Sequence, residues 1–280
     1  MDSNKLKMKV LAIVTGASRG FGYSIVKELI KKTTAEAQAS HIDFKLYARS
    51  LSSLESTEKL IKELLPQGNK IDNFAIDFSD IEQSEATFKK SLENVSFGEY
   101  QKVIFFNNHG SLSFLQRIDS LTNFIQIKKD LDMNITSFLV TSSIFLSKIR
   151  EQNTPLLTNT SFFLVNSSSL AGIKPFDTWG IYCTTKAARE MLLRVISEES
   201  KSIPNIKTLN YSPGAMDTDM QGEVRANTID EESKKYFVNL KEEGKLVDPF
   251  KSAAKMMVLL FENTFESAAH LDYHDLPVIQ

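Results

Sequence analysis

The 280-residue sequence predicts a single-domain α/β fold, in which helices cover both faces of a doubly wound parallel sheet. Strand-like apolar runs alternate with amphipathic segments along most of the chain. The clearest strand-like runs, such as residues 10–14, are apolar at every position, which is typical of parallel strands covered on both faces. Glycines and polar residues follow several runs, where a doubly wound sheet places its ligands.

Each predicted element has its own local signal. Apolar residues three and four positions apart between residues 25 and 30 indicate the first helix, and Pro66 ends the second. We interpret residues 32–41 as a polar surface connection. The expected strands are residues 10–14, 44–48, 71–76, 103–106, 162–165, 206–211 and 268–273. The expected helices are residues 20–31, 51–65, 81–94, a long helix within 118–150, 179–200 and 249–261.

The pattern indicates one domain spanning residues 1–280. Hydrophobic residues make up 42% of the chain, and neither a repeat nor a linker interrupts the alternation. Residues 213–247 carry many charges and only scattered apolar positions, which indicates either a substrate lid or a solvated helical excursion. Residues 262–280 form a C-terminal segment that includes the last expected strand.

Composition argues against several classes of partner. A net charge of -2 and a pI near 6.1 give no global attraction to nucleic acid or anionic membrane. The apolar run at residues 256–261 is far shorter than the roughly 20 residues that span a bilayer. Residues 1–7 lead directly into a strand and lack a signal peptide's apolar stretch. The single cysteine, Cys183, is interpreted as an apolar filler in a reducing compartment. We therefore expect a cytoplasmic protein.

A tyrosine and a lysine four residues apart give the first chemical signal. Tyr182 and Lys186 fall on one face of a predicted helix. An ammonium one turn from a phenol favours the phenolate and lowers the tyrosine pKa from about 10 towards neutral, which suits a general acid. Tyr23 and Lys27 have the same spacing. Only Tyr182 has a serine, Ser169, thirteen residues upstream, where a hydroxyl after a strand can hold a substrate oxygen.

Three glycines between the first strand and the first helix give the second signal. Gly16, Gly20 and Gly22 permit a tight turn and let backbone amides approach a pyrophosphate. Dinucleotide sites commonly carry an acid after the second strand, which binds ribose hydroxyls and repels a 2′-phosphate. This chain has Arg49 there, and Arg19 in the glycine loop. Guanidinium groups favour NADP(H) over NAD(H), unless both are ordinary surface arginines.

These signals together resemble one family over nearly the whole chain. The loop at residues 15–22, with Ser169, Tyr182 and Lys186, resembles the short-chain dehydrogenase/reductase family, which has a Rossmann-type fold. Within that family the chain is similar to the sepiapterin reductases, a pterin-reducing branch. The closer similarity involves residues 174–176, 179, 182–183, 186–189, 209–214, 217–220, 244–248 and 269–272.

The resemblance implies a catalytic set and a reaction. The matching residues are Asn134, Ser169, Tyr182 and Lys186. By that match, hydride passes from the nicotinamide C4 to a ketone carbon while Tyr182 protonates the carbonyl oxygen. Lys186 holds the nicotinamide ribose and lowers the tyrosine pKa. Ser169 hydrogen-bonds the substrate oxygen, and Asn134 supports a water relay.

The resemblance also implies binding residues for NADPH/NADP and for a pterin. The cofactor positions are Gly16, Ala17, Ser18, Arg19, Gly20, Phe21, Gly22, Arg49, Ser50, Asp77, Phe78, Asn108, Lys186, Met216, Asp217, Thr218, Asp219, Met220 and Gln221. The substrate positions are Ser168, Ser169, Tyr182, Gly214 and Asp272. Asp272 matches a carboxylate that accepts hydrogen bonds from the pterin 2-amino group and ring nitrogens. Trp179 and Phe176 would wall a flat heterocycle.

Two residue assignments stay open. The family's usual Asn-Asn-Ala-Gly carries histidine here, His109, which is either a tolerated substitution beside the ribose or an additional catalytic group. Near the C-terminus, alternate residues on a strand suggest a zinc site, although reduction by NADPH needs no metal and we expect none. The candidate ligands are His270, Asp272, His274 and Asp275.

Three functions remain in competition. The first is reduction of pterin side-chain carbonyls, which forms tetrahydrobiopterin from 6-pyruvoyl-tetrahydropterin and also reduces sepiapterin. The second is a broader carbonyl or diketone reductase that uses the same catalytic residues. The third is a noncatalytic NADP-binding sensor, which has no need of a tuned acid. The family resemblance further implies a homodimer packed through the helices that carry Asn134 and Tyr182.

Overall fold

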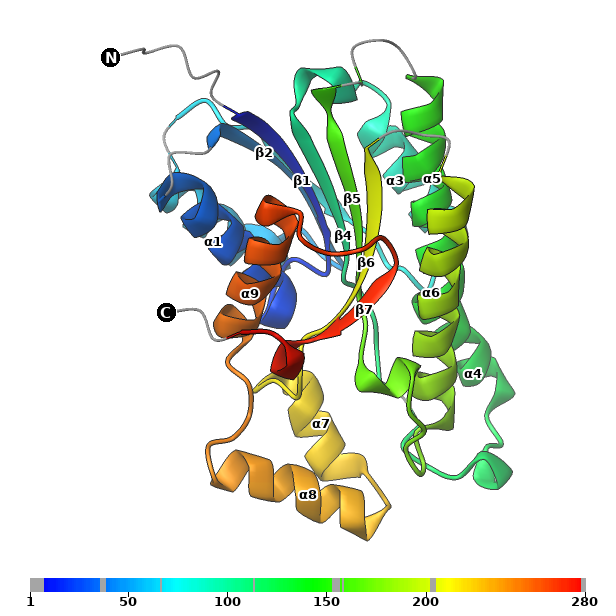
Figure 1. Cartoon of the computed structure of the whole chain (residues 1–280). Coiled ribbons are helices and arrows are strands. Elements are labelled where there is room, and N and C mark those ends of the chain that lie inside the picture. Colours follow the sequence, from blue (N-terminus) through cyan, green and yellow to red (C-terminus); the bar gives the residue numbers. More distant parts are fainter. Residues whose placement is uncertain are drawn as a thin grey trace.

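One parallel sheet forms the centre of the computed structural model (Figure 1). Residues 8–277 are described, apart from residues 36–38, 66, 113, 153–156, 158 and 202–204. The described strands follow the order β3-β2-β1-β4-β5-β6-β7, and each neighbouring pair is parallel. They are β1 (Met8–Thr15), β2 (Ala39–Ala48), β3 (Ile71–Ala75), β4 (Lys102–Asn107), β5 (Ser161–Ser167), β6 (Ile206–Ser212) and β7 (Ala269–Asp272). The strand order reverses between β1 and β4, which confirms the predicted doubly wound fold.

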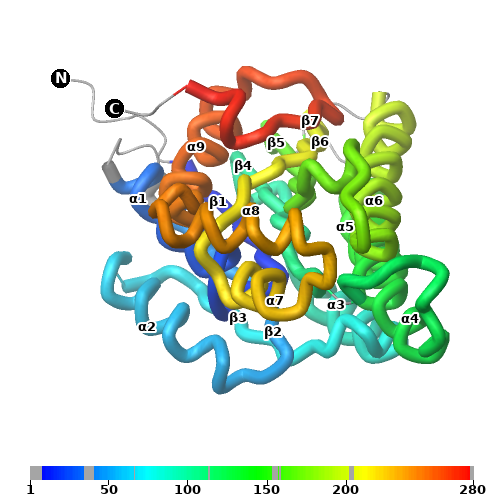
Figure 2. Tube along the Cα trace, turned by 90° about the horizontal axis from the view of Figure 1, so that it is seen from below, coloured from blue at the N-terminus to red at the C-terminus, as the bar shows by residue number. Residues whose placement is uncertain are grey.

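Helices cover both faces of this sheet (Figures 1 and 2). Helices α1, α2 and α9 pack on one face, whereas α3, α5 and α6 pack on the other. The described α-helices are α1 (Gly20–Ala35), α2 (Glu55–Leu64), α3 (Ile81–Leu92), α4 (Phe124–Leu131), α5 (Ser137–Glu151), α6 (Gly180–Glu199), α7 (Asp219–Asn227), α8 (Glu231–Glu242) and α9 (Pro249–Glu262).

The two-sided cover explains why residues 10–14 of β1 are all apolar. Val10, Ala12 and Val14 belong to the core cluster under α1 and α9, whereas Leu11 and Ile13 belong to the cluster on the opposite face. Each of these five side chains is at most 1% exposed. Because successive residues of a strand point to opposite faces, a strand buried on both faces needs no polar alternation.

Two segments differ from the sequence expectation. Residues 32–35 continue α1, and residues 39–41 belong to β2, so the polar connection is shorter than predicted. The hydroxyl of Thr33 donates to the carbonyls of Leu29 and Ile30, which lets a polar residue extend the helix. The long helix expected within residues 118–150 is divided into α4 and α5 by a π-helical turn at Asp132–Thr136.

The carboxyl ends of the strands all meet at one edge of the sheet, and α7 and α8 lie beyond this edge (Figures 1 and 2). Residues 213–247 contain two helices, α7 and α8. The chain returns through α9 to β7, which pairs with the end of β6, and a 3-10 turn at Tyr273–Asp275 follows. This topology brings the C-terminal segment to the edge that holds the predicted site.

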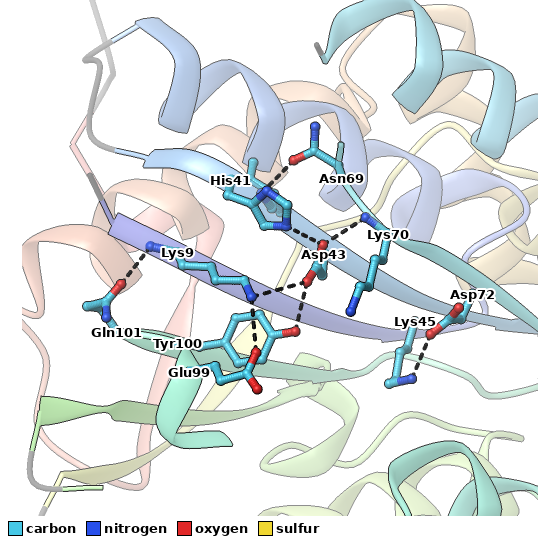
Figure 3. A network of polar contacts seen from close by, with 11 residues as sticks. Lys9, His41, Asp43, Lys45, Asn69, Lys70, Asp72, Glu99, Tyr100 and Gln101 are labelled. Carbon is cyan, nitrogen blue, oxygen red and sulfur yellow. Dashed lines mark hydrogen bonds and ion pairs between the residues drawn. The ribbon is translucent and has the colours of Figure 1, made fainter. Parts of the chain in front are cut away.

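A separate polar network lies nearer the opposite end of the sheet and surrounds Asp43 (Figure 3). The buried carboxylate accepts from the Lys70 amide at 2.7 Å and the Tyr100 hydroxyl at 2.8 Å, and it contacts the His41 ring at 2.6 Å. A cavity of about 680 Å³ adjoins it, between β2, β3 and α3. Because Asp43 is already bonded on both oxygens, we regard this network as structural.

Candidate active site

The loop between β1 and α1 is shaped by its glycines. Gly16 and Gly20 have φ angles of 65° and 54°, which side-chain-bearing residues rarely adopt. A Cβ on Gly22 would lie 2.0 Å from the carbonyl oxygen of Gly16, so only glycine lets α1 begin this close to β1. The loop presents the N-terminus of α1, whose free amides and dipole attract a pyrophosphate. The chain thus offers a cradle that fits a dinucleotide.

Two residues of the loop are anchored to the protein interior. The Ala17 amide donates to the Tyr47 carbonyl at 3.1 Å, and the Ala17 carbonyl accepts from the Thr57 hydroxyl at 3.0 Å. Phe21 stacks on Tyr211 with 6.1 Å between ring centres. Ser18 is partly exposed in the same turn. Ala17 and Phe21 therefore fix the loop.

The two predicted 2′-phosphate residues have different surroundings. Arg19 reaches from the glycine loop to an ion pair with Asp219 at the start of α7, and both side chains are mostly exposed. Such an exposed pair contributes at most about 1 kcal/mol, so an incoming anion can replace the carboxylate. Arg49 is exposed directly after β2, and Ser50 beside it accepts a hydrogen bond from the Ser53 amide.

The predicted cofactor positions Asp77 and Asn108 follow the ends of β3 and β4. Asp77 is exposed, and its carboxylate accepts from the amide and hydroxyl of Ser79 at 3.0 and 2.8 Å. The Asn108 side chain donates to the Thr15 carbonyl at 3.1 Å and accepts from the Ser167 hydroxyl at 2.8 Å. Asn108 therefore joins the ends of β1 and β5 beneath the glycine loop.

His109 is enclosed on every side. Its ring stacks on Phe78 with 3.7 Å between centres, and its nitrogens contact the hydroxyls of Thr15 at 3.0 Å and Ser137 at 2.7 Å. Burial lowers the pKa of His109 well below its usual range, and Arg189 lowers it further. A neutral ring with both nitrogens bonded internally indicates a packing role at this departure from the family pattern.

Ser169, Tyr182 and Lys186 meet where β5 ends and α6 begins. Ser169 follows β5, and its hydroxyl contacts the Tyr182 phenol and accepts from the Ala171 amide at 3.2 Å. The buried Lys186 ammonium lies 5.4 Å from the centre of the Tyr182 ring and donates to the Ser167 carbonyl at 2.6 Å. The structure therefore brings together the three residues that the sequence selected.

The electrostatics of this set differ from the sequence expectation. Burial raises the pKa of Tyr182 to about 12, against the lowering influence of Ser169 and Arg189. Burial also lowers the pKa of Lys186 well below its usual range, with Arg189 adding to the effect and Glu190 opposing it. The expectation that Lys186 acidifies Tyr182 considered only the attraction between ammonium and phenolate, whereas burial penalises the charged forms of both residues. At neutral pH the phenol keeps its proton, as an acid must before it donates.

Asn134 lies in the π-helical turn and is buried. Its side chain donates to the Ser111 hydroxyl at 3.1 Å and the Asp130 carbonyl at 3.0 Å, and its oxygen accepts from the Ser111 amide at 3.0 Å. The Asn134 carbonyl accepts from Arg189 Nε, and Arg189 also donates to the His109 carbonyl at 2.9 Å. Burial lowers the pKa of Arg189 to about 9, which leaves it charged at neutral pH. Asn134 therefore orders the backbone, and a water relay through it stays a prediction.

The predicted substrate positions gather at the ends of β5, β6 and β7. Gly214 has a φ of 82°, and a Cβ there would lie 2.8 Å from Val247. Asp272 is 4% exposed. Its carboxylate accepts from the Ser212 hydroxyl at 2.5 Å and the His274 amide at 2.9 Å. Each oxygen can still accept a further bond. The Ser168 hydroxyl donates instead to the Glu190 carboxylate.

An aromatic cluster closes over this edge. Trp179 stacks on Phe237 of α8 with 5.5 Å between ring centres, and it meets Phe176 at 5.6 Å and Tyr182 at 5.7 Å. Val224 of α7 belongs to the same cluster. Trp179 and Phe176 are the walls expected from the sequence, whereas Phe237 and Val224 are not among the predicted residues. Val224 and Phe237 are apolar residues among charged neighbours, and this contrast is the sequence signal that could have identified them as buried.

Part of the predicted cofactor segment touches the glycine loop. The Thr218 methyl lies 3.6 Å from the place a Cβ would take on Gly20, beside the Arg19–Asp219 pair. Met220 follows on α7 and is 37% exposed.

The other residues of the predicted cofactor segment 216–221 contact α8 and the chain just before α9. Met216 pairs with Val247, Asp217 forms an ion pair with Lys241 at 2.6 Å, and the buried Gln221 donates to the Phe237 carbonyl at 3.5 Å.

Tyr23, Lys27 and His270 have partners elsewhere. Tyr23 and Lys27 pack against Phe250 of α9, with Lys27 Nζ 4.7 Å from its ring centre, away from the Ser169 cluster. His270 contacts Glu190 at 2.8 Å. Within the described part of the chain, no three His, Cys, Asp or Glu side chains converge as metal ligands would. Among the described residues, no helix combines the length and the hydropathy that a membrane span requires.

The shared edge therefore presents a dinucleotide cradle beside a protonated phenol, a hydroxyl and a buried lysine. This combination defines a Rossmann-type oxidoreductase that uses a nicotinamide cofactor. Residues 10–229 match the family model described as short chain dehydrogenase. The chain belongs to this family, and the predicted fold and enzyme class are confirmed.

Three known proteins illustrate the similarity. A sepiapterin reductase from Meriones unguiculatus is 34% identical over 276 residues, covering 98% of this chain and 100% of the relative. A benzil reductase ((S)-benzoin forming) from Bacillus cereus is 27% identical over 241 residues, covering 85% and 88%. A solved alcohol dehydrogenase from Thermococcus sibiricus, complexed with 5-hydroxy-NADP, superposes with a TM-score of 0.69 at 21% identity, covering 96% and 99%.

Proposed function

We propose that this protein is an NADPH-dependent reductase of pterin side-chain carbonyls, which forms tetrahydrobiopterin from 6-pyruvoyl-tetrahydropterin and accepts sepiapterin. The observation that carries the proposal is the pairing of β7 with β6 and of β6 with β5, because it brings Asp272 to the edge that holds Ser169 and Tyr182. A hydroxyl and phenol suit a carbonyl, whereas a carboxylate suits the 2-amino end of a pterin. The similarity to sepiapterin reductases supports the same substrate class.

The chain's own residues supply the acid chemistry of this reaction. When bound, the nicotinamide supplies the hydride. Tyr182 donates its proton to the carbonyl oxygen as negative charge develops there, and Ser169 holds that oxygen beside the phenol. Lys186, anchored on the Ser167 carbonyl, offers positive charge to the phenolate that remains. Trp179 and Phe237 cover this edge and exclude water.

Two arginines support NADPH as the cofactor. Arg49 occupies the place after β2 where an acid would repel a 2′-phosphate, and its side chain is exposed. Arg19 lies in the glycine loop and is held only by the exposed Asp219. Both guanidinium groups suit bidentate contacts with a phosphate.

The test follows NADPH oxidation by absorbance with purified protein and sepiapterin, with NADH run alongside. We expect a clear preference for NADPH. Asp272→Asn removes the anchoring charge but keeps one acceptor oxygen, which can hold the His274 amide while the new NH2 group donates to the Ser212 hydroxyl. We expect it to lower kcat/KM for sepiapterin by about 10- to 100-fold, because a hydrogen bond to a charged group is worth about 1.5–3 kcal/mol. A small diketone, which cannot reach this carboxylate, should be reduced at a similar rate by both forms.

A broader carbonyl or diketone reductase is the second candidate. It is supported by the similarity to benzil reductases and by the bonds that Asp272 already makes to Ser212 and His274. Diketone activity without sepiapterin turnover would favour this function and contradict the pterin proposal. Tight NADPH binding without turnover of either substrate would favour a noncatalytic sensor.

We also propose a homodimer packed through α5 and α6. Large apolar side chains are exposed on the outer surfaces of these helices, namely Leu139 at 47%, Met191 at 57% and Val195 at 42%. Covering them in a second copy would remove this apolar surface from water. We propose the cytoplasm as the site of action, because one unpaired cysteine suits a reducing compartment.

A further inference from the structure

A row of polar side chains crosses the sheet beneath α5 and α6. Asn107, Asn166, Asn210 and His270 are register partners on β4, β5, β6 and β7. The Asn166 side chain donates to the Asn210 oxygen at 2.9 Å. The three asparagines are fully buried, and the His270 side chain is 13% exposed. Buried polar groups cost free energy unless they form hydrogen bonds. Packing of the core therefore gives no reason for polar residues at these four positions.

The end of this row meets a buried carboxylate on the catalytic helix. Glu190 lies one turn after Lys186 on α6, and its side chain is 4% exposed. One oxygen accepts from the Ser168 hydroxyl and contacts His270 Nδ1 at 2.8 Å. Because a carboxylate only accepts, His270 Nδ1 must carry the hydrogen. Glu190 Oε2 and His270 Nε2 are buried without a hydrogen-bond partner among the described residues.

Glu190 thereby holds the middle of a three-residue segment whose ends belong to the active site. The carbonyl of Ser167 accepts from Lys186, and the hydroxyl of Ser169 contacts the Tyr182 phenol. The carbon chain of Glu190 also packs close to Gly172, in the turn that follows this segment. Loss of the hydrogen bond between Glu190 and Ser168 would therefore displace both Ser167 and Ser169.

The charge of Glu190 also acts on Lys186. Burial and Arg189 both lower the pKa of Lys186, and Glu190 is the group that raises it. Several other charged or titratable groups surround Glu190 and Lys186. They are Tyr182 and Arg189 on α6, His109 after β4, and His270 and Asp272 on β7. Without the carboxylate, this site would hold an excess of buried positive charge.

We infer that Glu190 and His270 form a buried carboxylate–imidazole pair that positions the Ser167–Ser169 segment and supplies the negative charge beside Lys186, an inference that rests on the proposed reductase function. The pair connects α6, which carries the acid, with β7, which carries Asp272. Both are positioning residues, because they act through Ser168 and Lys186.

The test compares Glu190→Gln with wild type over a range of pH, using sepiapterin or, if that is not reduced, a diketone. Glutamine keeps an acceptor for Ser168 but removes the charge, so Lys186 should lose its proton at lower pH. The alkaline decline of kcat should therefore begin about 1 pH unit lower or more. NADPH affinity, measured by fluorescence, should change less than about twofold. His270→Gln should lower kcat with the same retention of NADPH binding.

Glu199→Gln is the matched control, since Glu199 is exposed at the end of the same helix. Its pH profile should match wild type. An unshifted profile in Glu190→Gln would overturn the inference while leaving the proposed function intact. If Glu190→Gln does not fold, His270→Gln decides: unchanged kcat overturns the inference, and lower kcat with retained NADPH binding supports it. Wild type inactive with both substrates would overturn the proposed function and this inference together.

Discussion

At the scale of single residues, Tyr182 shows how burial and catalysis are combined. Desolvation raises its pKa to about 12, and contact with Ser169 and the charge of Arg189 limit that rise. A phenol in this state is protonated throughout the neutral range, so it is ready to donate rather than to accept. The alkaline limit of the reaction then belongs to Lys186, whose pKa is lowered by burial.

Replacing Tyr182 by Phe should therefore remove turnover and leave binding intact. The change deletes the proton donor, and a general acid contributes about 100- to 10,000-fold. NADPH affinity should stay within about twofold, measured by fluorescence titration. Tyr23→Phe is the matched control, because Tyr23 has the same spacing to a lysine but packs against Phe250. Retained turnover in Tyr182→Phe would exclude this residue as the acid.

Which site residues the sequence could predict depended on chain distance. Ser169, Tyr182 and Lys186 were accessible because they lie within eighteen positions and follow helix and strand periods. Glu190 and His270 are 80 positions apart, and their contact exists only because β7 adds to the sheet beside β6. Glu190 lies four positions after Lys186 on α6, but only the fold supplied its partners. The Tyr182 pKa also required the fold, since burial set its direction.

At the scale of elements, the junction between β1 and α1 depends on one close backbone contact. The carbonyl of Gly16 occupies the space that a side chain on Gly22 would need. Sequence reasoning identified these glycines from their spacing between a strand and a helix. It did not find the π-helical turn at Asp132–Thr136, because a single extra residue in a helical turn leaves the apolar period nearly unchanged.

Gly22→Ala should consequently disrupt the cofactor site. The added carbon would meet a backbone oxygen at 2.0 Å, so α1 must move away from β1. We expect loss of NADPH binding in calorimetry and a loss of about 1–3 kcal/mol of unfolding free energy in urea, as in other overpacked sites.

Gly222→Ala provides the comparison, because Gly222 lies within α7 and a Cβ there meets only the end of Arg225, at 3.7 Å. It should leave NADPH binding unchanged and gain about 0.5–1 kcal/mol from helix propensity. Normal NADPH binding by Gly22→Ala would contradict the close-contact argument.

At the scale of the whole molecule, the exposed apolar surface is uneven. The outer residues of α5 and α6 include Leu139, Met191 and Val195, whereas α2 on the other face exposes Leu64 at 43%. The fold class followed from the alternation of apolar runs. The surface for association did not follow from the sequence. Helical periodicity shows which positions are apolar, but it does not show which of them stay exposed to solvent in the folded monomer.

Light scattering should show a dimer for the wild type and a monomer for Val195→Glu. A carboxylate at the centre of an apolar contact would be buried without a partner, which is strongly unfavourable. Leu64→Glu makes the same chemical change on α2 and should leave the mass unchanged. A wild-type monomer, or a dimer that persists in Val195→Glu, would contradict packing through α6.

The strand order has a consequence for how the protein is made. β1 lies between β2 and β4, and Val10 pairs with Lys102, which is 92 positions later in the chain. At a synthesis rate of about 5–20 residues per second, one edge of β1 waits roughly 5 to 18 seconds for its neighbour. During that interval an apolar strand remains open to pairing with other nascent chains. Yield in the cell should therefore depend on chaperones that cover β1, a requirement set by topology and independent of the chemistry at the other ends of the strands.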